Sequence, residues 1–119
     1  MARTYRQLKV WQDAKSLAVT IYKETESFPK AETYGLQSQV RRAAVSIASN
    51  IAEGQGRKTR NEFIQFLCTA RGSLLEVETQ LSIAFELGYL RKSSYEDLDK
   101  RSYAVLGLLN RLIESLHER

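Results

Sequence analysis

The sequence predicts an all-α protein that folds as an antiparallel, up-and-down four-helix bundle. The 119 residues include six glycines and one proline, fewer than the turns of a sheet-rich fold usually need. Apolar residues recur at spacings of three and four along four segments, which is the period of an amphipathic helix. The connections between these segments are short, so neighbouring helices should run in opposite directions. Length and a 43% hydrophobic content indicate one domain, residues 1–119.

The first helix is expected over residues 8–27 and the second over residues 34–53. Pro29 disfavours helical geometry at the residue before it and marks the exit from the first helix. Gly54 is predicted to end the second helix in the left-handed cap conformation. The first apolar stripe consists of Val10, Ala14, Leu17, Ile21 and Phe28. The second consists of Leu36, Val40, Ala43, Ala44, Ile47 and Ile51.

The third helix has the most regular stripe and the clearest start. Thr59 stands three residues before Glu62, the spacing of a capping box in which the two side chains satisfy free backbone donors. Gly88 is predicted to end this helix. Its steps of four and three are typical of a bundle seam. The stripe consists of Phe63, Leu67, Ala70, Leu74, Val77, Leu81 and Ala84.

The fourth helix is expected to begin at an N-cap formed by Ser93 or Ser94. Glu96 and Asp97 would then lie in its first turn, where acidic side chains favour the helix dipole. Its stripe consists of Tyr95, Leu98, Ser102, Val105, Leu109, Leu112 and Leu116.

Composition argues against several classes of protein. One cysteine, Cys68, and one histidine, His117, provide neither an internal disulfide nor the ligands of a zinc site. The sequence has no apolar run long enough to cross a bilayer, and its polar start does not resemble a signal peptide, so a cytoplasmic location is expected. The net charge of +4 is mild, but residues 1–58 hold ten Lys and Arg against five Asp and Glu. This asymmetry permits a polyanionic partner and is equally typical of a solvated face.

No catalytic constellation fits the four helices, so we expect neither an enzyme nor a cofactor or metal. The only histidine lacks the Glu-x-x-His motif of di-iron bundles. The segment GQGRKT resembles the end of a P-loop, but Arg57 replaces the glycine before the lysine, and no strand precedes it. Ser73 lacks a nucleophile-elbow pattern. Glu76 and Glu78 are two residues apart and cannot share a helical face.

Apolar residues outside the core stripes predict self-association. Some lie on the third helix away from its seam, and others, mostly small, form a shoulder on the second helix. The alternative is scattered surface hydrophobics, which are normal when single. Because they cluster at helical spacing, a subunit contact is favoured. The predicted contact residues are Val45, Ala48, Ala52, Ile64, Cys68 and Leu75.

Polar residues on the second and third helices provide two further hypotheses. One set is predicted to form a structural junction, in which the side chains satisfy loop backbone groups and one another, and this is favoured over a ligand site. The set consists of Asn50, Glu53, Arg71 and Glu76. A second set is either a solvated polar stripe or a basic surface that contacts phosphates. This set consists of Arg41, Arg42, Arg57, Lys58 and Arg60.

Three segments together resemble a known family, the proteins encoded in intervening sequences of bacterial 23S ribosomal RNA genes. The segments are YRQLKVWQDAKSLAVTIYKETESFP, YGLQSQVRRAAVSIASNIAEGQGR and EFIQFLCTARGSLLEVETQL. The resemblance covers nearly the whole chain and is strongest over residues 34–81. One departure is Ala48, which stands where the family often has proline.

The resemblance implies a four-helix bundle that assembles as a homopentamer without established enzymatic activity. The architecture is also similar to basic pentameric accessory proteins of diversity-generating retroelements, which bind nucleic acid and a reverse transcriptase. Two functions therefore stay open. One is an oligomeric module that binds RNA or DNA through electrostatic phosphate contacts, and the other is a protein-interaction or assembly scaffold without a nucleic-acid role.

Overall fold

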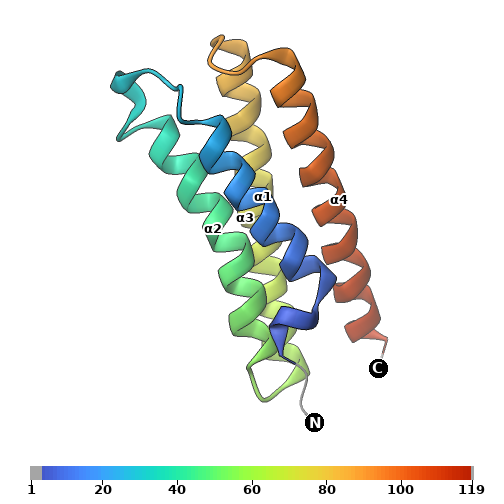
Figure 1. Cartoon of the computed structure of the whole chain (residues 1–119). Coiled ribbons are helices and arrows are strands. Elements are labelled where there is room, and N and C mark those ends of the chain that lie inside the picture. The colour runs from blue at the N-terminus through green and yellow to red at the C-terminus, as the bar shows by residue number, and fades with distance from the viewer. Residues whose placement is uncertain (1–3, 119) are drawn as a thin grey trace.

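Four long α-helices confirm the all-α class in a computed structural model that describes residues 4–118 (Figure 1). The ends of the predicted domain, residues 1–3 and 119, lie outside the described residues. The elements are η1 (Tyr5–Gln7), α1 (Lys9–Glu24), η2 (Lys30–Glu32), α2 (Leu36–Gln55), α3 (Arg60–Glu86) and α4 (Lys92–His117), where η is a 3-10 helix.

The helices form an elongated molecule of 45 × 23 × 21 Å. In Figure 1 the α1–α2 and α3–α4 connections lie at the upper end, and the α2–α3 turn lies at the lower end. α1 packs against α2 and α4, and α3 packs against the same two helices, with α2 and α3 forming the most extensive pair. α1 and α3 therefore lie diagonally across the bundle.

The predicted stripes meet in one core to which all four helices contribute. Four of their residues, Leu36, Phe63, Tyr95 and Leu112, are half-buried against this core, and the others are buried. In α4, Ile113 is buried beside Leu112. Periodicity therefore identified the core face of every helix.

The C-terminus of α1 differs from its prediction because tertiary contacts end the helix early. The helix stops at Glu24 and not at residue 27, and Thr25 forms a fully buried C-cap. The Thr25 hydroxyl donates to the Ile21 carbonyl at 2.7 Å. Its backbone carbonyl accepts a hydrogen bond of 2.7 Å from the Gln37 side chain of α2. These contacts hold the end of α1 against α2.

The prediction that Gly54 caps α2 in a left-handed conformation is wrong. α2 continues to Gln55, and Gly54 is buried inside it with an ordinary backbone, since Gly88 is the positive-φ residue within 4–118. A Cβ atom at Gly54 would lie 2.6 Å from the Cβ of Phe66 and 3.0 Å from the ring of Phe63 on α3. Glycine is present because the two helices approach closely there.

Gly88 ends α3 as predicted, with φ of 81°. The Gly88 amide donates to the Phe85 carbonyl and the Tyr89 amide donates to the Ala84 carbonyl, the paired bonds of a Schellman motif. This motif directs the chain into the short connection that leads to α4.

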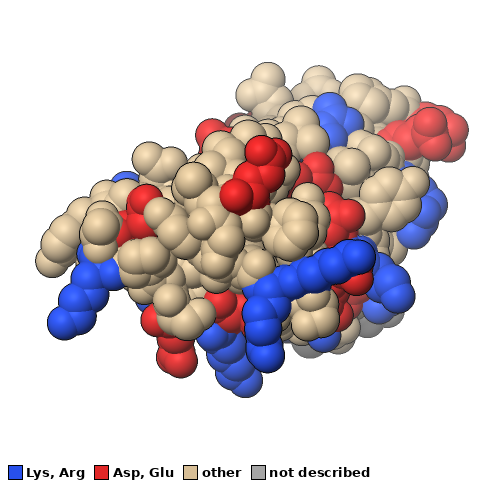
Figure 2. All heavy atoms as spheres, turned by 90° about the horizontal axis from the view of Figure 1, so that it is seen from above, with Lys and Arg blue, Asp and Glu red and all other residues tan. Residues whose placement is uncertain are grey.

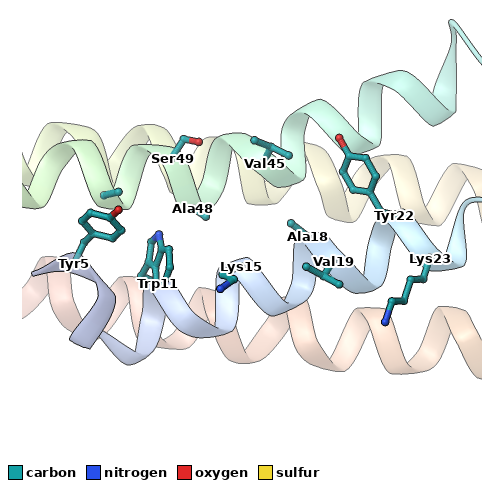
Figure 3. Close-up of a pocket in the computed structure, with 11 residues that line it drawn as sticks. Tyr5, Trp11, Lys15, Ala18, Val19, Tyr22, Lys23, Val45, Ala48 and Ser49 are labelled. Atoms are coloured by element: carbon teal, nitrogen blue, oxygen red, sulfur yellow. The ribbon is translucent and has the colours of Figure 1, made fainter.

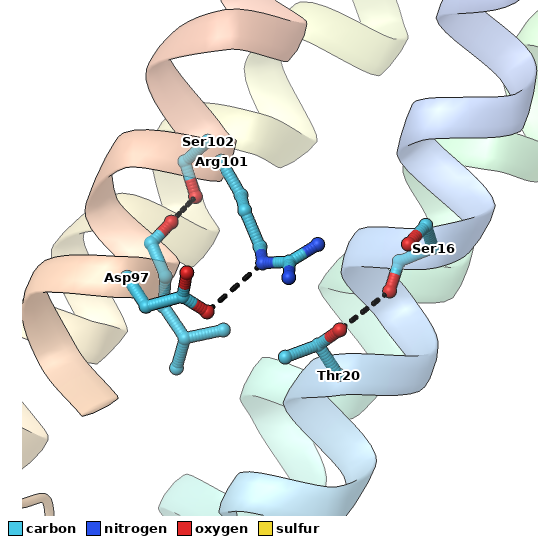
Figure 4. A network of polar contacts seen from close by, with 6 residues as sticks. Ser16, Thr20, Asp97, Arg101 and Ser102 are labelled. Carbon is cyan, nitrogen blue, oxygen red and sulfur yellow. Dashed lines mark hydrogen bonds and ion pairs between the residues drawn. The ribbon is translucent and has the colours of Figure 1, made fainter. Parts of the chain in front are cut away.

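The predicted start of α4 is wrong by two or three residues. The helix begins at Lys92 with Arg91 as its N-cap, so Ser93 and Ser94 lie inside the first turn. Asp97 lies beyond that turn and pairs with Arg101 at 2.9 Å. Figure 4 shows the Arg101 side chain directed from α4 toward α1. Asp97 thus forms an ion pair along the helix surface, and no acidic residue lies in the first turn to complement the N-terminal dipole of α4.

Candidate functional site

The five predicted basic residues do not form one surface. Arg41 and Arg42 lie in the first half of α2, whereas Arg57, Lys58 and Arg60 lie at and beyond its C-terminal end. Thirteen helical steps of about 1.5 Å each place Arg42 roughly 20 Å from Gln55, the last residue of α2, and Arg57 lies two residues beyond it. At the upper end of the bundle, Lys and Arg side chains are interspersed with Asp and Glu (Figure 2).

Arg41 is committed to contacts within the chain. Its Nε atom donates to the Thr25 hydroxyl at 3.0 Å, and its Nη2 atom donates to the Tyr22 carbonyl at 2.9 Å. Its guanidinium carbon lies 4.6 Å from the centre of the Tyr22 ring. Arg41 therefore satisfies free carbonyl and hydroxyl groups at the end of α1, a role that spacing along α2 does not reveal.

Arg57, Lys58 and Arg60 surround the turn between α2 and α3, and all three are exposed. The Arg57 guanidinium pairs with Glu53 at 3.3 Å and lies 4.7 Å from the ring centre of Phe66. The turn thus presents three cations close together in sequence, and a carboxylate partners Arg57.

The predicted cap of α3 is present on the same turn. The Thr59 hydroxyl accepts a hydrogen bond of 3.1 Å from the Glu62 amide. The same hydroxyl lies 3.2 Å from the Glu62 carboxylate and donates to it. Thr59 therefore caps α3 as its spacing predicted, whereas the Glu62 carboxylate accepts from the Thr59 hydroxyl and not, as predicted, from a backbone amide.

The four residues predicted to form a polar junction have separate surroundings. Asn50 donates to the carbonyl and the hydroxyl of Ser46, at 2.8 and 3.0 Å. Glu53 pairs with Arg57, whereas Arg71 donates to Asn110 on α4 at 2.9 Å. Glu76 is exposed on α3. The junction prediction is wrong in grouping them, because the four residues face different neighbours.

The apolar contact predicted on α3 is corrected at one residue. Ile64 is only 8% exposed and belongs to the core, so it is not available to a second subunit. Cys68 is half-buried, with its sulfur 3.8 Å from an Arg71 nitrogen. Leu75 is 49% exposed, as a contact residue should be.

The three contact residues predicted on α2 line a groove between α1 and α2 (Figure 3). Its volume is about 550 Å³. The lining combines aromatic, aliphatic and small side chains with two lysines at the rim. The residues are Tyr5, Trp11, Lys15, Ala18, Val19, Tyr22 and Lys23 with η1 and α1, and Val45, Ala48, Ser49 and Ala52 on α2.

Sequence reasoning missed the α1 side of this groove. Trp11, Lys15, Ala18 and Tyr22 recur at steps of four, three and four, which is a second face of α1 beside its core stripe. The helical spacing of these residues indicates the face, but Lys15 interrupts its apolar character. In the structure Lys15 lies 5.3 Å from the Trp11 ring centre, so its stem and charge lie over this aromatic face.

An acidic pair lies on the α3–α4 side of the bundle. Partial burial and then the charge of Asp99 on α4 raise the pKa of Glu78 above its usual value. Both causes disfavour a charged Glu78 carboxylate. This pair contributes a pH-dependent term to stability and does not form part of the groove.

None of the helices within residues 4–118 is apolar over a length that could span a bilayer. Comparison with curated proteins gave no match.

Among solved structures, the chain is similar to a protein of unknown function from the S23 ribosomal protein family of Bacteroides thetaiotaomicron. The TM-score is 0.79 at 26% sequence identity, over 87% of this chain and 97% of the other. The model of the 23S rRNA-intervening sequence protein family matches residues 6–111. The chain, with its four helices and this match over most of its length, belongs to the 23S rRNA-intervening sequence protein family.

Proposed function

We propose that this protein is a non-enzymatic module that works as a homo-oligomer in the cytoplasm. The observation that supports assembly is the apolar groove between α1 and α2. Val19 and Val45 lie on its two walls and are 47% and 44% exposed in the single chain. Contiguous apolar surface of this kind on a soluble protein typically marks an interaction site. The family resemblance supports five subunits.

The assembly is tested by the mass of the purified protein in solution. Light scattering at micromolar concentration should give five times the mass of the chain, and Val45→Glu should shift this mass toward the monomer because it places a charge in the groove. Tyr103→Glu is the matched control, since Tyr103 is exposed on α4 outside the groove. A parent protein that is monomeric would contradict the proposal.

A second candidate function is electrostatic binding of RNA or DNA by the α2–α3 turn. Its support is the exposed cluster of Arg57, Lys58 and Arg60. An oligomer would present this turn several times, which raises avidity without new contacts. Arg41 has no part in this candidate because its guanidinium is engaged inside the chain. Affinity should depend on phosphates and salt and little on base sequence.

Fluorescence anisotropy across a salt series tests this candidate with structured RNA and duplex DNA as probes. Arg57→Ala/Lys58→Ala should weaken binding and flatten the log-log salt slope by roughly one to two units per site. Lys30→Ala/Lys92→Ala removes the same charge at the opposite end of the bundle and should have a smaller effect. Equal affinity and slope in the parent and the turn variant would favour a scaffold without a nucleic-acid role.

A further inference from the structure

The exposed face of α3 has the properties of a contact surface. This outer face consists of Gly72, Leu75, Glu76, Thr79, Ile83 and Glu86, of which all but Glu76 recur at steps of three and four, and Glu76 lies beside Leu75 four residues after Gly72. All six are exposed and lie opposite the core stripe of α3. Leu75 and Ile83, 49% and 46% exposed, are eight residues apart, or about 12 Å along the helix. The face is therefore a narrow ridge with two apolar side chains.

Gly72 has no packing role within the described chain. A Cβ atom added there would meet nothing within 4 Å beyond its own helix. Glycine inside a helix is less stable than alanine, so close packing usually explains its presence there. At Gly54 that explanation is the close approach of α3, and at Gly72 the chain itself offers none. A glycine on an exposed ridge permits another helix to approach closely.

The groove and the ridge also have opposite charge. Lys15 and Lys23 stand at the groove, and no acidic residue is among the described residues that line it. On α3, residues 72–86 include three glutamates and no lysine or arginine. Two of these, Glu76 and Glu86, belong to the outer face. Placing one groove against another would bring lysines together, whereas placing the ridge in the groove pairs lysine with glutamate.

We infer that the groove between α1 and α2 of one copy receives the outer face of α3 of the next copy. This inference rests on the proposed homo-oligomer and identifies its two contact surfaces. Since α1 and α3 lie diagonally across the bundle, a chain cannot place its own ridge in its own groove. Each copy then offers one groove and one ridge, and this head-to-tail contact closes into a ring when the rotation between copies permits.

Charge exchange between the two surfaces tests the pairing. Lys15→Glu/Lys23→Glu and Glu76→Lys/Glu86→Lys should each weaken assembly by at least about tenfold at low ionic strength, because like charges then face one another. The fourfold variant that carries both changes should recover assembly. Sedimentation velocity measures the mass, and circular dichroism confirms equal helicity. Pairing of groove with groove would leave Glu76→Lys/Glu86→Lys oligomeric, which overturns the inference.

Gly72→Leu provides a test that does not depend on charge. It should favour the α3 helix in the single chain while blocking the close approach of another copy, so helicity is retained and the mass falls. An oligomer of unchanged mass and affinity in this variant would contradict the ridge contact. A monomeric parent would instead overturn the proposed assembly together with the inference, so the two failures are distinguishable by the parent alone.

Discussion

The hydroxyl oxygen of Ser46 on α2 lies 2.9 Å from that of Ser73 on α3. Ser73 is buried, and Asn50 donates to the Ser46 hydroxyl at 3.0 Å. A buried hydroxyl without a partner costs free energy, and this short chain of hydrogen bonds avoids that cost. It also joins α2 to α3, the most extensive helix pair. Ser73 therefore has a structural partner.

Removal of both serines should destabilise the fold by less than the sum of the two single removals. Ser73→Ala and Ser46→Ala should each lower the free energy of unfolding by about 1 kcal/mol, because each removes the hydrogen bond between the two hydroxyls. The double variant should cost less than the sum of the single ones. Urea unfolding followed by circular dichroism provides the values, and strict additivity would show that the two hydroxyls do not interact.

Gly54→Ala should destabilise the protein although alanine favours helix. The new Cβ would lie 2.6 Å from the Phe66 Cβ, an atom fixed close to its backbone, so α2 and α3 must separate. Overpacking of this kind costs about 1–3 kcal/mol. Gly107→Ala is the control, because its Cβ would meet only the flexible end of Arg111 at 3.5 Å. It should stabilise α4 by up to about 1 kcal/mol. Equal shifts in Tm for the two variants would refute the close approach at Gly54.

Arg41→Ala should lower the free energy of unfolding by about 1–3 kcal/mol, because hydrogen bonds to Thr25 and Tyr22 are lost with a charged donor. Arg42→Ala removes the same charge from the exposed neighbouring position and should change stability by less than about 0.5 kcal/mol. Thermal unfolding of both variants checks this difference. If Arg42→Ala lost more stability than Arg41→Ala, the end of α1 would not depend on Arg41.

Glu78 should make stability depend on pH. Its pKa is raised in the folded chain, so the protonated carboxyl favours folding below the unfolded pKa, near 4.5, and this contribution is lost as the pH rises through the folded pKa. Glu78→Gln should therefore gain stability relative to the parent as the pH rises above about 4.5, by less than about 1 kcal/mol because the site is partly solvated.

Asp99→Asn separates the two causes of this pKa shift. It removes the neighbouring charge but leaves Glu78 partly buried, so the pH dependence should become smaller without disappearing. Urea unfolding at several pH values measures both variants. A Glu78→Gln effect that is constant with pH would show that the carboxyl titrates alike in the folded and unfolded chains.

The tertiary structure also decided which predicted contact residues are available to a second copy. Val45 on α2 and Leu75 on α3 are exposed, whereas Ile64 near the start of α3 is covered. All three fit a helical pattern outside the core stripe, but the angular width of the buried face depends on how closely the neighbouring helices pack at each level. Helical spacing alone could not distinguish them.

The sequence by itself determined the four helices, their core faces and the caps at Thr59 and Gly88, whereas long-range contacts decided what the remaining polar and small residues do. The periodicity of α1 to α4 and the Thr59–Glu62 cap depend on residues three or four apart, and these interactions are local. The role of Arg41 depends on groups 16 and 19 residues away, and that of Gly54 on the close approach of α3. The separation of Arg41 and Arg42 from the basic turn likewise follows from the length of α2, because a rigid helix keeps its two ends apart.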